Sequence, residues 1–227
     1  MINDENAGRG LGWYSRGYLP HYEADNAIQF VTYHLADSLP ATTLERLEYE
    51  IRSIPEKQKA ATRRERIEQL MDAGHGACYL GEPQIAKLVQ GTFLHFNEER
   101  YHLYAWVIMP NHVHVLFQPL PGYSVRKIIA SWKSFTGRCI ADHVRELGTQ
   151  GSRPAARQEP GVPIIVPVWH REYWDRVIRD DKHFKVTVEY INNNPVKAGL
   201  VDRIELWPWS SVVYQATTGN HHEESMG

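Results

Sequence analysis

Two apolar, β-branched runs separated by a Pro-Asn turn constrain the fold of this chain more than any other feature. They cover residues 101–109 and 112–118. Because side chains alternate along a strand, His112 and His114 point to one face of the second run, and the valines beside them point to the other. The pattern predicts a β-hairpin that has one apolar face and one face with two histidines.

Two imidazoles side by side on a rigid strand form half of a metal site. A His-x-His pair is more often structural or exposed. It indicates a metal site only if a third ligand and a reactive group occur elsewhere in the sequence. A helix predicted at 180–194 contains Tyr190 and Asn194, which share one face because they are four residues apart. Asn194 can offer a carbonyl oxygen to a hard divalent cation, and Tyr190 a phenol oxygen.

Composition narrows the class of protein. The 227 residues, 42% hydrophobic and 23% charged, suit one medium-sized domain with an insertion. The formal net charge is -2, so binding to a polyanion would need a locally basic face. Two distant cysteines, Cys78 and Cys139, favour reduced thiols over a disulfide framework. No apolar run is long enough to cross a membrane, so we expect a soluble, cytoplasmic protein with no membrane partner.

The remaining elements extend the hairpin into a sheet with helices. A further strand is predicted at 28–35, with Phe30, Thr32 and His34 on one face, where His34 is either a neighbour of the metal site or a sheet-surface histidine. The other expected elements are helices at 43–72 (broken at Pro55), 83–99, 125–147 and 180–194, and a strand at 163–169. The last helix should end before Pro195, because a residue that precedes proline disfavours the helical conformation.

This order of elements predicts an α+β fold. It is a ferredoxin-like or RRM-like antiparallel sheet with helices packed on one face, plus a helical insertion. We expect an N-terminal arm at 1–22, a single domain at 23–214 with the insertion at about 43–73, and a flexible tail at 215–227. The charged middle of the insertion favours a solvated hairpin, and a basic arm for nucleic acid is the alternative.

In this order, the motifs resemble the REP-associated tyrosine transposases, IS200-like members of the HUH superfamily of single-strand DNA nucleases with one catalytic tyrosine. The resemblance rests first on the histidine strand and the tyrosine helix, at 109–114 and 190–200. It extends through shorter matches at 17–22, 105–107, 131–135 and 169–179. It therefore covers most of residues 17–211.

The resemblance implies a metal-dependent single-strand DNA endonuclease and strand transferase. His112, His114 and Asn194 would hold one Mg²⁺ or Mn²⁺, and Tyr190 would be the nucleophile that forms a 5′-phosphotyrosine intermediate. The implied partners are single-stranded DNA hairpins of REP-type palindromes. We expect a monomer, with a dimer as the alternative. Tyr173 is a rival nucleophile, but the ligand four residues after Tyr190 favours Tyr190.

Candidate DNA contacts fall into an arm and two basic groups. The arm would recognise bases beside a hairpin, as the family implies, or else cap the sheet; its residues are Gly17, Tyr18, Leu19, Pro20 and His21. The basic groups would bind phosphates or remain solvated charges; they are Arg126, Lys127 and Lys133 on one helix, and Arg176 and Arg179 nearer the C-terminus.

Two other functions stay open at this point. One is a binding module that binds DNA or RNA hairpins without cutting them. The presence of a suitable residue at every catalytic position of the family argues against it. The other is a hydrolase in which the metal activates water, which would turn over without a covalent adduct and would depend little on Tyr190.

Overall fold

A four-stranded antiparallel sheet forms the centre of the computed structural model, which describes residues 12–15, 20–23, 26–149 and 167–223. The strands are β3 (Gln29–His34), β4 (Tyr101–Ile108), β5 (His112–Pro119) and β6 (Trp174–Val177). Their order across the sheet is β4-β5-β3-β6. Helices connect β3 to β4 and β5 to β6, which gives the split β-α-β arrangement of a ferredoxin-like fold. The predicted fold class is confirmed.

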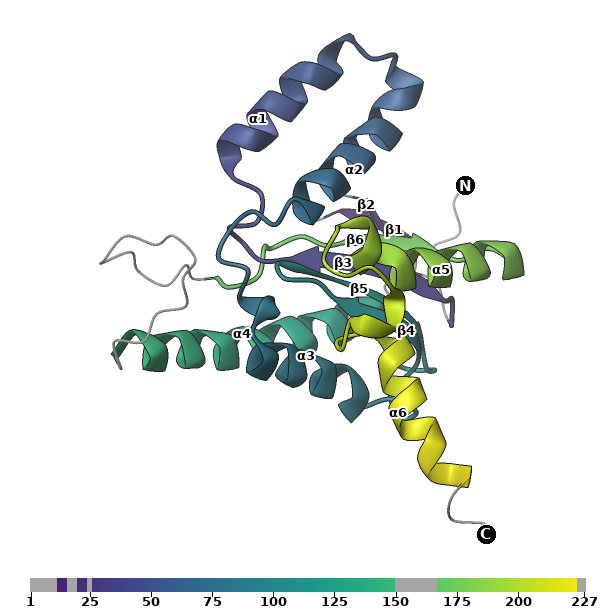
Figure 1. The fold of residues 1–227 in the computed structure, drawn as a ribbon. Coiled ribbons are helices and arrows are strands. Elements are labelled where there is room, and N and C mark those ends of the chain that lie inside the picture. The colour runs from purple at the N-terminus through teal and green to yellow at the C-terminus, as the bar shows by residue number, and fades with distance from the viewer. Residues whose placement is uncertain (1–11, 16–19, 24–25, 150–166, 224–227) are drawn as a thin grey trace.

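One face of the sheet is covered by two helices, α3 (Pro83–His95) and α4 (Val125–Thr149) (Figure 1). The buried side chains between these helices and the sheet form the largest apolar cluster of the described residues. Trp132 of α4 lies at its centre, with ring contacts to Phe93, Tyr101 and Phe117. This layer matches the predicted helices on one face.

The opposite face carries α5 (Asp181–Lys197), a layer that the prediction did not include. Asp180 caps the start of α5 by accepting a hydrogen bond from the His183 backbone N–H at 2.7 Å. Ile191 of α5 is fully buried against apolar side chains of β3, β4 and β5. The remaining side chains on this face are the polar ones that form the candidate site.

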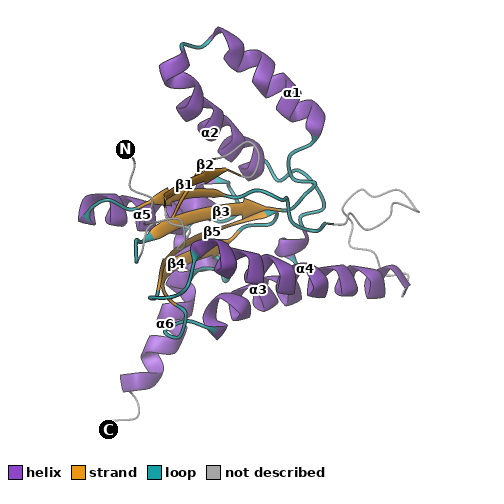
Figure 2. Cartoon of the chain, turned by 180° about the vertical axis from the view of Figure 1, so that it is seen from behind, coloured by secondary structure: helices purple, strands orange, loops and turns teal. Residues whose placement is uncertain are grey.

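The predicted insertion is a helical hairpin that stands away from the sheet in both views (Figures 1 and 2). It consists of α1 (Ala41–Glu50), the short turn η2 (Ile51–Ser53) and α2 (Glu56–Asp72), with the predicted break at Pro55. A small apolar core of its own, which includes Leu47, Ile67 and Met71, holds the two helices together. The turn η3 (Tyr79–Gly81) then leads into α3.

Two predicted boundaries are wrong. The fourth strand is β6 rather than 163–169, and of that segment only 167–169 are described, with Trp169 in an isolated bridge to Leu35. Helix α5 does not end before Pro195 but continues to Lys197. Proline in the last turn removes a single N–H donor, and the backbone bond from Ala198 N–H to Asn194 C=O still forms at 2.9 Å.

The structure adds short elements near both ends of the chain. The arm contains a short antiparallel hairpin of β1 (Gly12–Ser15) and β2 (Pro20–Glu23). After the short turn η4 (Ile204–Leu206), α6 (Ser211–Glu223) extends into the segment 215–227 that was predicted to be a flexible tail. None of the helices described here has the length and apolar character that a bilayer crossing requires.

Candidate active site

The histidine pair lies on the face of the sheet that α5 covers. In the register of β3 and β5, His112 is opposite His34 and His114 is opposite Thr32. Both paired histidines are 1% exposed, and their ring centroids are 4.8 Å apart. The alternation expected from the sequence therefore places both imidazoles in one buried layer between strands and helix.

The hydrogen bonds of Asn111 fix the tautomer of His112. The Asn111 side-chain amide donates to two carbonyls, those of Met71 at 3.1 Å and His75 at 2.9 Å. Its oxygen therefore faces His112 Nδ1, 2.7 Å away, and can only accept. His112 must donate from Nδ1, which leaves an unprotonated Nε2 with a lone pair and no hydrogen-bond partner.

His114 is held in a similar way. Its Nδ1 lies 2.7 Å from the Thr32 hydroxyl, and its buried Nε2 has no hydrogen-bond partner. Burial, helped by the nearby Lys197 ammonium, lowers the pKa of His114 to about 3. Burial also lowers the pKa of His112 well below its ordinary value, with smaller effects from His114 and Lys197. Both rings are therefore neutral, the form in which imidazole binds a metal.

Helix α5 brings the predicted nucleophile and third ligand to the same place. The Tyr190 ring meets the His114 ring edge-on at 5.3 Å and the Phe30 ring at 5.8 Å. Asn194, one turn further on, is fully buried, and neither its amide oxygen nor its amide nitrogen has a hydrogen-bond partner. All four side chains that the resemblance singles out thus converge.

The Tyr190 phenol is strongly held in its protonated form. Burial raises the pKa of Tyr190 far above its usual value, and the carboxylates of Glu68 and Asp72 raise it further. Its buried hydroxyl has no hydrogen bond of good geometry, although the side chains of Glu68 and Asn194 interact with it. A phenolate would therefore form only with a cation or a proton acceptor beside it.

The donors fit a hard divalent cation. Across the described part of the chain, no three His, Cys, Asp or Glu side chains are grouped as a ready metal site. Two imidazole nitrogens and an amide oxygen nevertheless form a mixed set that Mg²⁺ or Mn²⁺ accepts. Leaving His112 Nε2, His114 Nε2 and Asn194 Oδ1 buried without partners is costly, and an ion between them would satisfy all three.

The insertion contributes charged side chains to the site that were not predicted from the sequence. Arg64, Glu68 and Asp72 are spaced four residues apart and so share one face of α2. Glu68 and Asp72 act on the Tyr190 phenol, while Arg64 and Glu68 act on Arg176 of β6. The i, i+4, i+8 spacing of charges was visible in the sequence, but nothing local indicated that this face is turned inward.

The two secondary candidates have different surroundings. Tyr173, the rival nucleophile, belongs to the apolar cluster beneath α4, on the other side of the sheet from the histidine pair. His34 is not a surface histidine: it is 1% exposed and its ring stacks on His170 at 4.5 Å and on Trp174 at 5.2 Å. Burial lowers the pKa of His34 to about 3, with His170 as the next cause.

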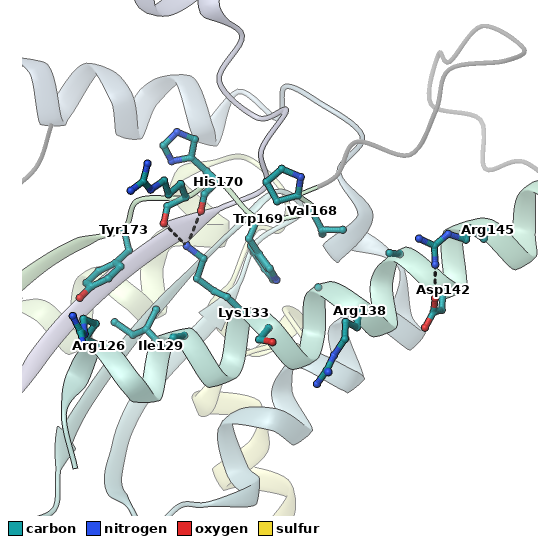
Figure 3. Close-up of a pocket in the computed structure, with 16 residues that line it drawn as sticks. Arg126, Ile129, Lys133, Arg138, Asp142, Arg145, Val168, Trp169, His170 and Tyr173 are labelled. Carbon is teal, nitrogen blue, oxygen red and sulfur yellow. Dashed lines mark hydrogen bonds and ion pairs between the residues drawn. The ribbon is translucent and has the colours of Figure 1, made fainter. Parts of the chain in front are cut away.

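The predicted DNA-binding cations occupy two separate places. Arg176 pairs with Phe30 in the sheet and so lies on the Tyr190 face, with the exposed Arg179 just beyond β6. Arg126 and Lys133 line a pocket along α4, whereas the neighbouring Lys127 is exposed (Figure 3). Of the predicted arm contacts, Gly17, Tyr18 and Leu19 lie outside the described residues, and Pro20 and His21 belong to β2.

Lys133 already has partners in the protein. Its ammonium donates to the carbonyls of His170 at 2.6 Å and Arg171 at 2.9 Å, and thereby ties α4 to the segment before β6 (Figure 3). Burial lowers the pKa of Lys133 to about 8. The predicted DNA contact of Lys133 stays a prediction, and only one N–H of the ammonium is left for a phosphate.

Comparisons with known proteins agree with the predicted resemblance. The family described as "Transposase IS200 like" matches residues 84–194. A Haemophilus influenzae protein named as a REP-associated tyrosine transposase is 34% identical over 108 residues, and the Escherichia coli REP-associated tyrosine transposase is 26% identical over 115 residues. The matches cover 46% and 51% of this chain, and the chain spans about half the length of these relatives, 54% and 56%.

One solved structure was matched over most of the chain. It is titled as a REP-associated tyrosine transposase bound to a REP hairpin, with a TM-score of 0.47 and 17% sequence identity. The match covers 89% of this chain and 86% of the other.

Proposed function

We propose that this chain, which belongs with the IS200-like transposases through residues 84–194, is a metal-dependent single-strand DNA endonuclease and strand transferase that acts on REP-type hairpins. One observation carries the proposal: two imidazole nitrogens, an amide and a phenol converge in one buried layer. Such a group of polar atoms without partners is costly in a folded protein, and it indicates a site that a ligand completes.

The residues divide into a cation-holding set and a nucleophile. His112, His114 and Asn194 would hold Mg²⁺ or Mn²⁺, which when bound supplies positive charge to the scissile phosphate. Asn111 and Thr32 orient the two imidazoles through their Nδ1 atoms, so that the buried, unpartnered Nε2 atoms are the nitrogens left to bind an ion. This support from neighbouring residues keeps the ligand geometry rigid before DNA arrives.

Tyr190 would carry the covalent step. Its phenol oxygen attacks the phosphorus, the bond from phosphorus to the 3′ oxygen breaks, and the strand is left as a 5′-phosphotyrosine and a free 3′-OH. The phenol loses one proton and the leaving 3′ oxygen gains one, so the step is balanced. Because the phosphodiester energy is kept in the new ester, a 3′-OH can reverse the step and join strands.

Glu68 is the group best placed to receive the phenol proton. Its carboxylate interacts with the Tyr190 hydroxyl, and its own pKa is raised, chiefly by burial. A carboxylate that binds protons more readily than usual is a better base for a phenol than an exposed one. Arg176, on the same face of the sheet, would bind a neighbouring phosphate of the strand.

The test uses end-labelled single-stranded hairpins, taken from palindromes that flank the gene, with Mn²⁺ or with EDTA. We expect cleavage and a covalent protein–DNA adduct on denaturing gels for the wild type with Mn²⁺, and neither with EDTA or with Tyr190→Phe. Tyr173→Phe is the matched control because it removes a phenol from the opposite side of the sheet, and it should keep both activities.

Three outcomes would contradict the proposal. Robust cleavage by Tyr190→Phe would remove the tyrosine from the mechanism. Metal-dependent cleavage without an adduct would instead indicate a hydrolase that uses water. Hairpins that bind tightly but are never cut, across the flanking palindromes, would indicate a binding module.

A further inference from the structure

The last turn of α2 reaches the histidine pair. Asp72 Oδ1 lies 3.7 Å from His112 Nε2, and Asp72 Oδ2 lies 3.4 Å from the ammonium of Lys197. The Asp72 side chain is only 12% exposed, and its Oδ1 atom is buried without a hydrogen-bond partner. The insertion thus delivers a carboxylate to the site from a segment about 40 residues before the histidines.

The contact between Asp72 and His112 joins two acceptors. The Asn111 hydrogen bond leaves a lone pair on His112 Nε2, and the carboxylate oxygen that faces it also offers only lone pairs. Both atoms are buried and neither has a hydrogen-bond partner, which is costly for polar atoms. A cation that both atoms bind would satisfy them by coordination.

We propose that Asp72 is a fourth protein ligand of the divalent cation that the histidine pair and Asn194 hold, so that the insertion completes the metal site. The inference rests on the proposed function and extends it to a residue outside the matched segment 84–194. A carboxylate also supplies the negative charge that two imidazoles and an amide lack, and hard cations favour charged oxygen ligands.

The spacing of the atoms is compatible with a shared ion. Two ligands about 2.1 Å from one cation are separated by about 3.0 Å when adjacent and by about 4.2 Å when opposite. The observed 3.7 Å lies within that range. Oδ2 of Asp72 is paired with Lys197, so Oδ1 is the oxygen that faces the histidine pair.

Lys197 would then compete with the divalent cation for the Asp72 carboxylate. Its ammonium pairs with Asp72 and lies over the Tyr190 ring, 5.7 Å from the ring centre. Once released from Asp72, the same ammonium can meet the scissile phosphate. Removing it should therefore leave the affinity for metal unchanged or raise it, whereas loss of a purely structural ion pair would lower that affinity.

The test is calorimetric titration of Mn²⁺ into the full chain. We expect Asp72→Asn to bind Mn²⁺ at least about tenfold more weakly than the wild type, the loss typical of a damaged metal site. Glu65→Gln makes the same change at an exposed position of α2 and should bind like the wild type. Lys197→Met should bind equally or more tightly. Thermal unfolding of each variant without metal checks that it is folded.

The outcomes separate the two proposals. If His112→Ala abolishes binding while Asp72→Asn binds like the wild type, the proposed metal site stands and the role of Asp72 is overturned. If the wild type itself does not bind Mn²⁺, the metal site of the proposed function fails. Should Asp72→Asn not fold, Lys197→Met decides: weaker binding would identify the Asp72–Lys197 pair as structural and overturn the inference.

Discussion

The two faces of the central sheet are built from the same strands but are used differently. On the face beneath α3 and α4, Val113 and Val115 are fully buried among apolar side chains. On the other face the alternate residues, His112 and His114, are equally buried but leave their Nε2 atoms without partners. A shift of one residue along β5 thus separates a packed core from a polar layer.

The polar atoms without partners on the α5 face lower the free energy of unfolding. A buried polar atom without a partner costs about 1–3 kcal/mol, and several such atoms lie together on the α5 face. An apolar layer like the one on the opposite face would avoid this cost. The chemistry proposed for the polar face would explain this cost, and the apolar face provides the packed core.

The largest effect expected on the polar face comes from Tyr190→Phe. Removing the nucleophile should lower the rate of adduct formation by at least about 10⁴-fold, as loss of a nucleophile does in other covalent enzymes. The free energy of unfolding should change by less than about 1 kcal/mol, because the hydroxyl makes no well-formed hydrogen bond. Rates from single-turnover gels and unfolding by urea measure the two quantities. A large loss of stability would show that the phenol is structural.

The matching experiment on the apolar face is Trp132→Ala. The indole is 2% exposed and packs between Phe93 and Phe117, so its loss should cost about 3–5 kcal/mol of unfolding free energy. Urea unfolding measures the loss, and cleavage per folded molecule should persist. Cleavage that disappears while the protein stays folded would mean that this face takes part in the chemistry.

Acid should destabilise the polar face selectively, and His34→Gln tests this. The pKa of His34 is about 3 in the folded protein and about 6.5 when unfolded, so between these values the unfolded chain binds more protons. Stability is lost as the pH falls from 6.5 toward 3, by up to about 1.4 kcal/mol per pH unit for this residue. The variant should flatten the pH dependence of unfolding. Replacement of the more exposed His102 by Gln is the control, and parallel curves for wild type and His34→Gln would refute the assignment.

The smallest expected effect distinguishes the two groups of cations. Arg176→Ala should weaken hairpin binding severalfold and reduce the slope of log affinity against log salt concentration by about 0.7, one phosphate contact on a single strand. Lys133→Ala should leave that slope nearly unchanged and lower stability instead, because its ammonium binds backbone carbonyls. Fluorescence anisotropy at several salt concentrations measures both slopes. The reverse result would place the DNA along α4.

Local periodicity explains which parts of the site the sequence could predict. Alternation placed His112 and His114 on one face, and the helical repeat placed Tyr190 above Asn194. The contribution of α2 could not be predicted in this way, since a charged helical face looks the same whether it meets solvent or a distant strand. The Asn111 bonds to Met71 and His75, which connect the insertion to the site, are equally invisible to any local pattern.

The fold shows the same limit. The strands β3, β4 and β5 were predicted because each alternates over six to eight residues, whereas β6 has only four and was misplaced. Helix α5 passes through Pro195 because Asn194 and Pro195 are both buried, and this tertiary packing overrides the local preference that predicted an earlier end.

Anomalous diffraction at the manganese edge, from crystals soaked in Mn²⁺, tests the central claim most directly. The account predicts one strong peak within bonding distance, about 2.1–2.3 Å, of His112 Nε2, His114 Nε2 and the Asn194 amide oxygen, with Asp72 turned toward it. A peak elsewhere, or none at the histidine pair while the crystals are saturated with Mn²⁺, would contradict the account.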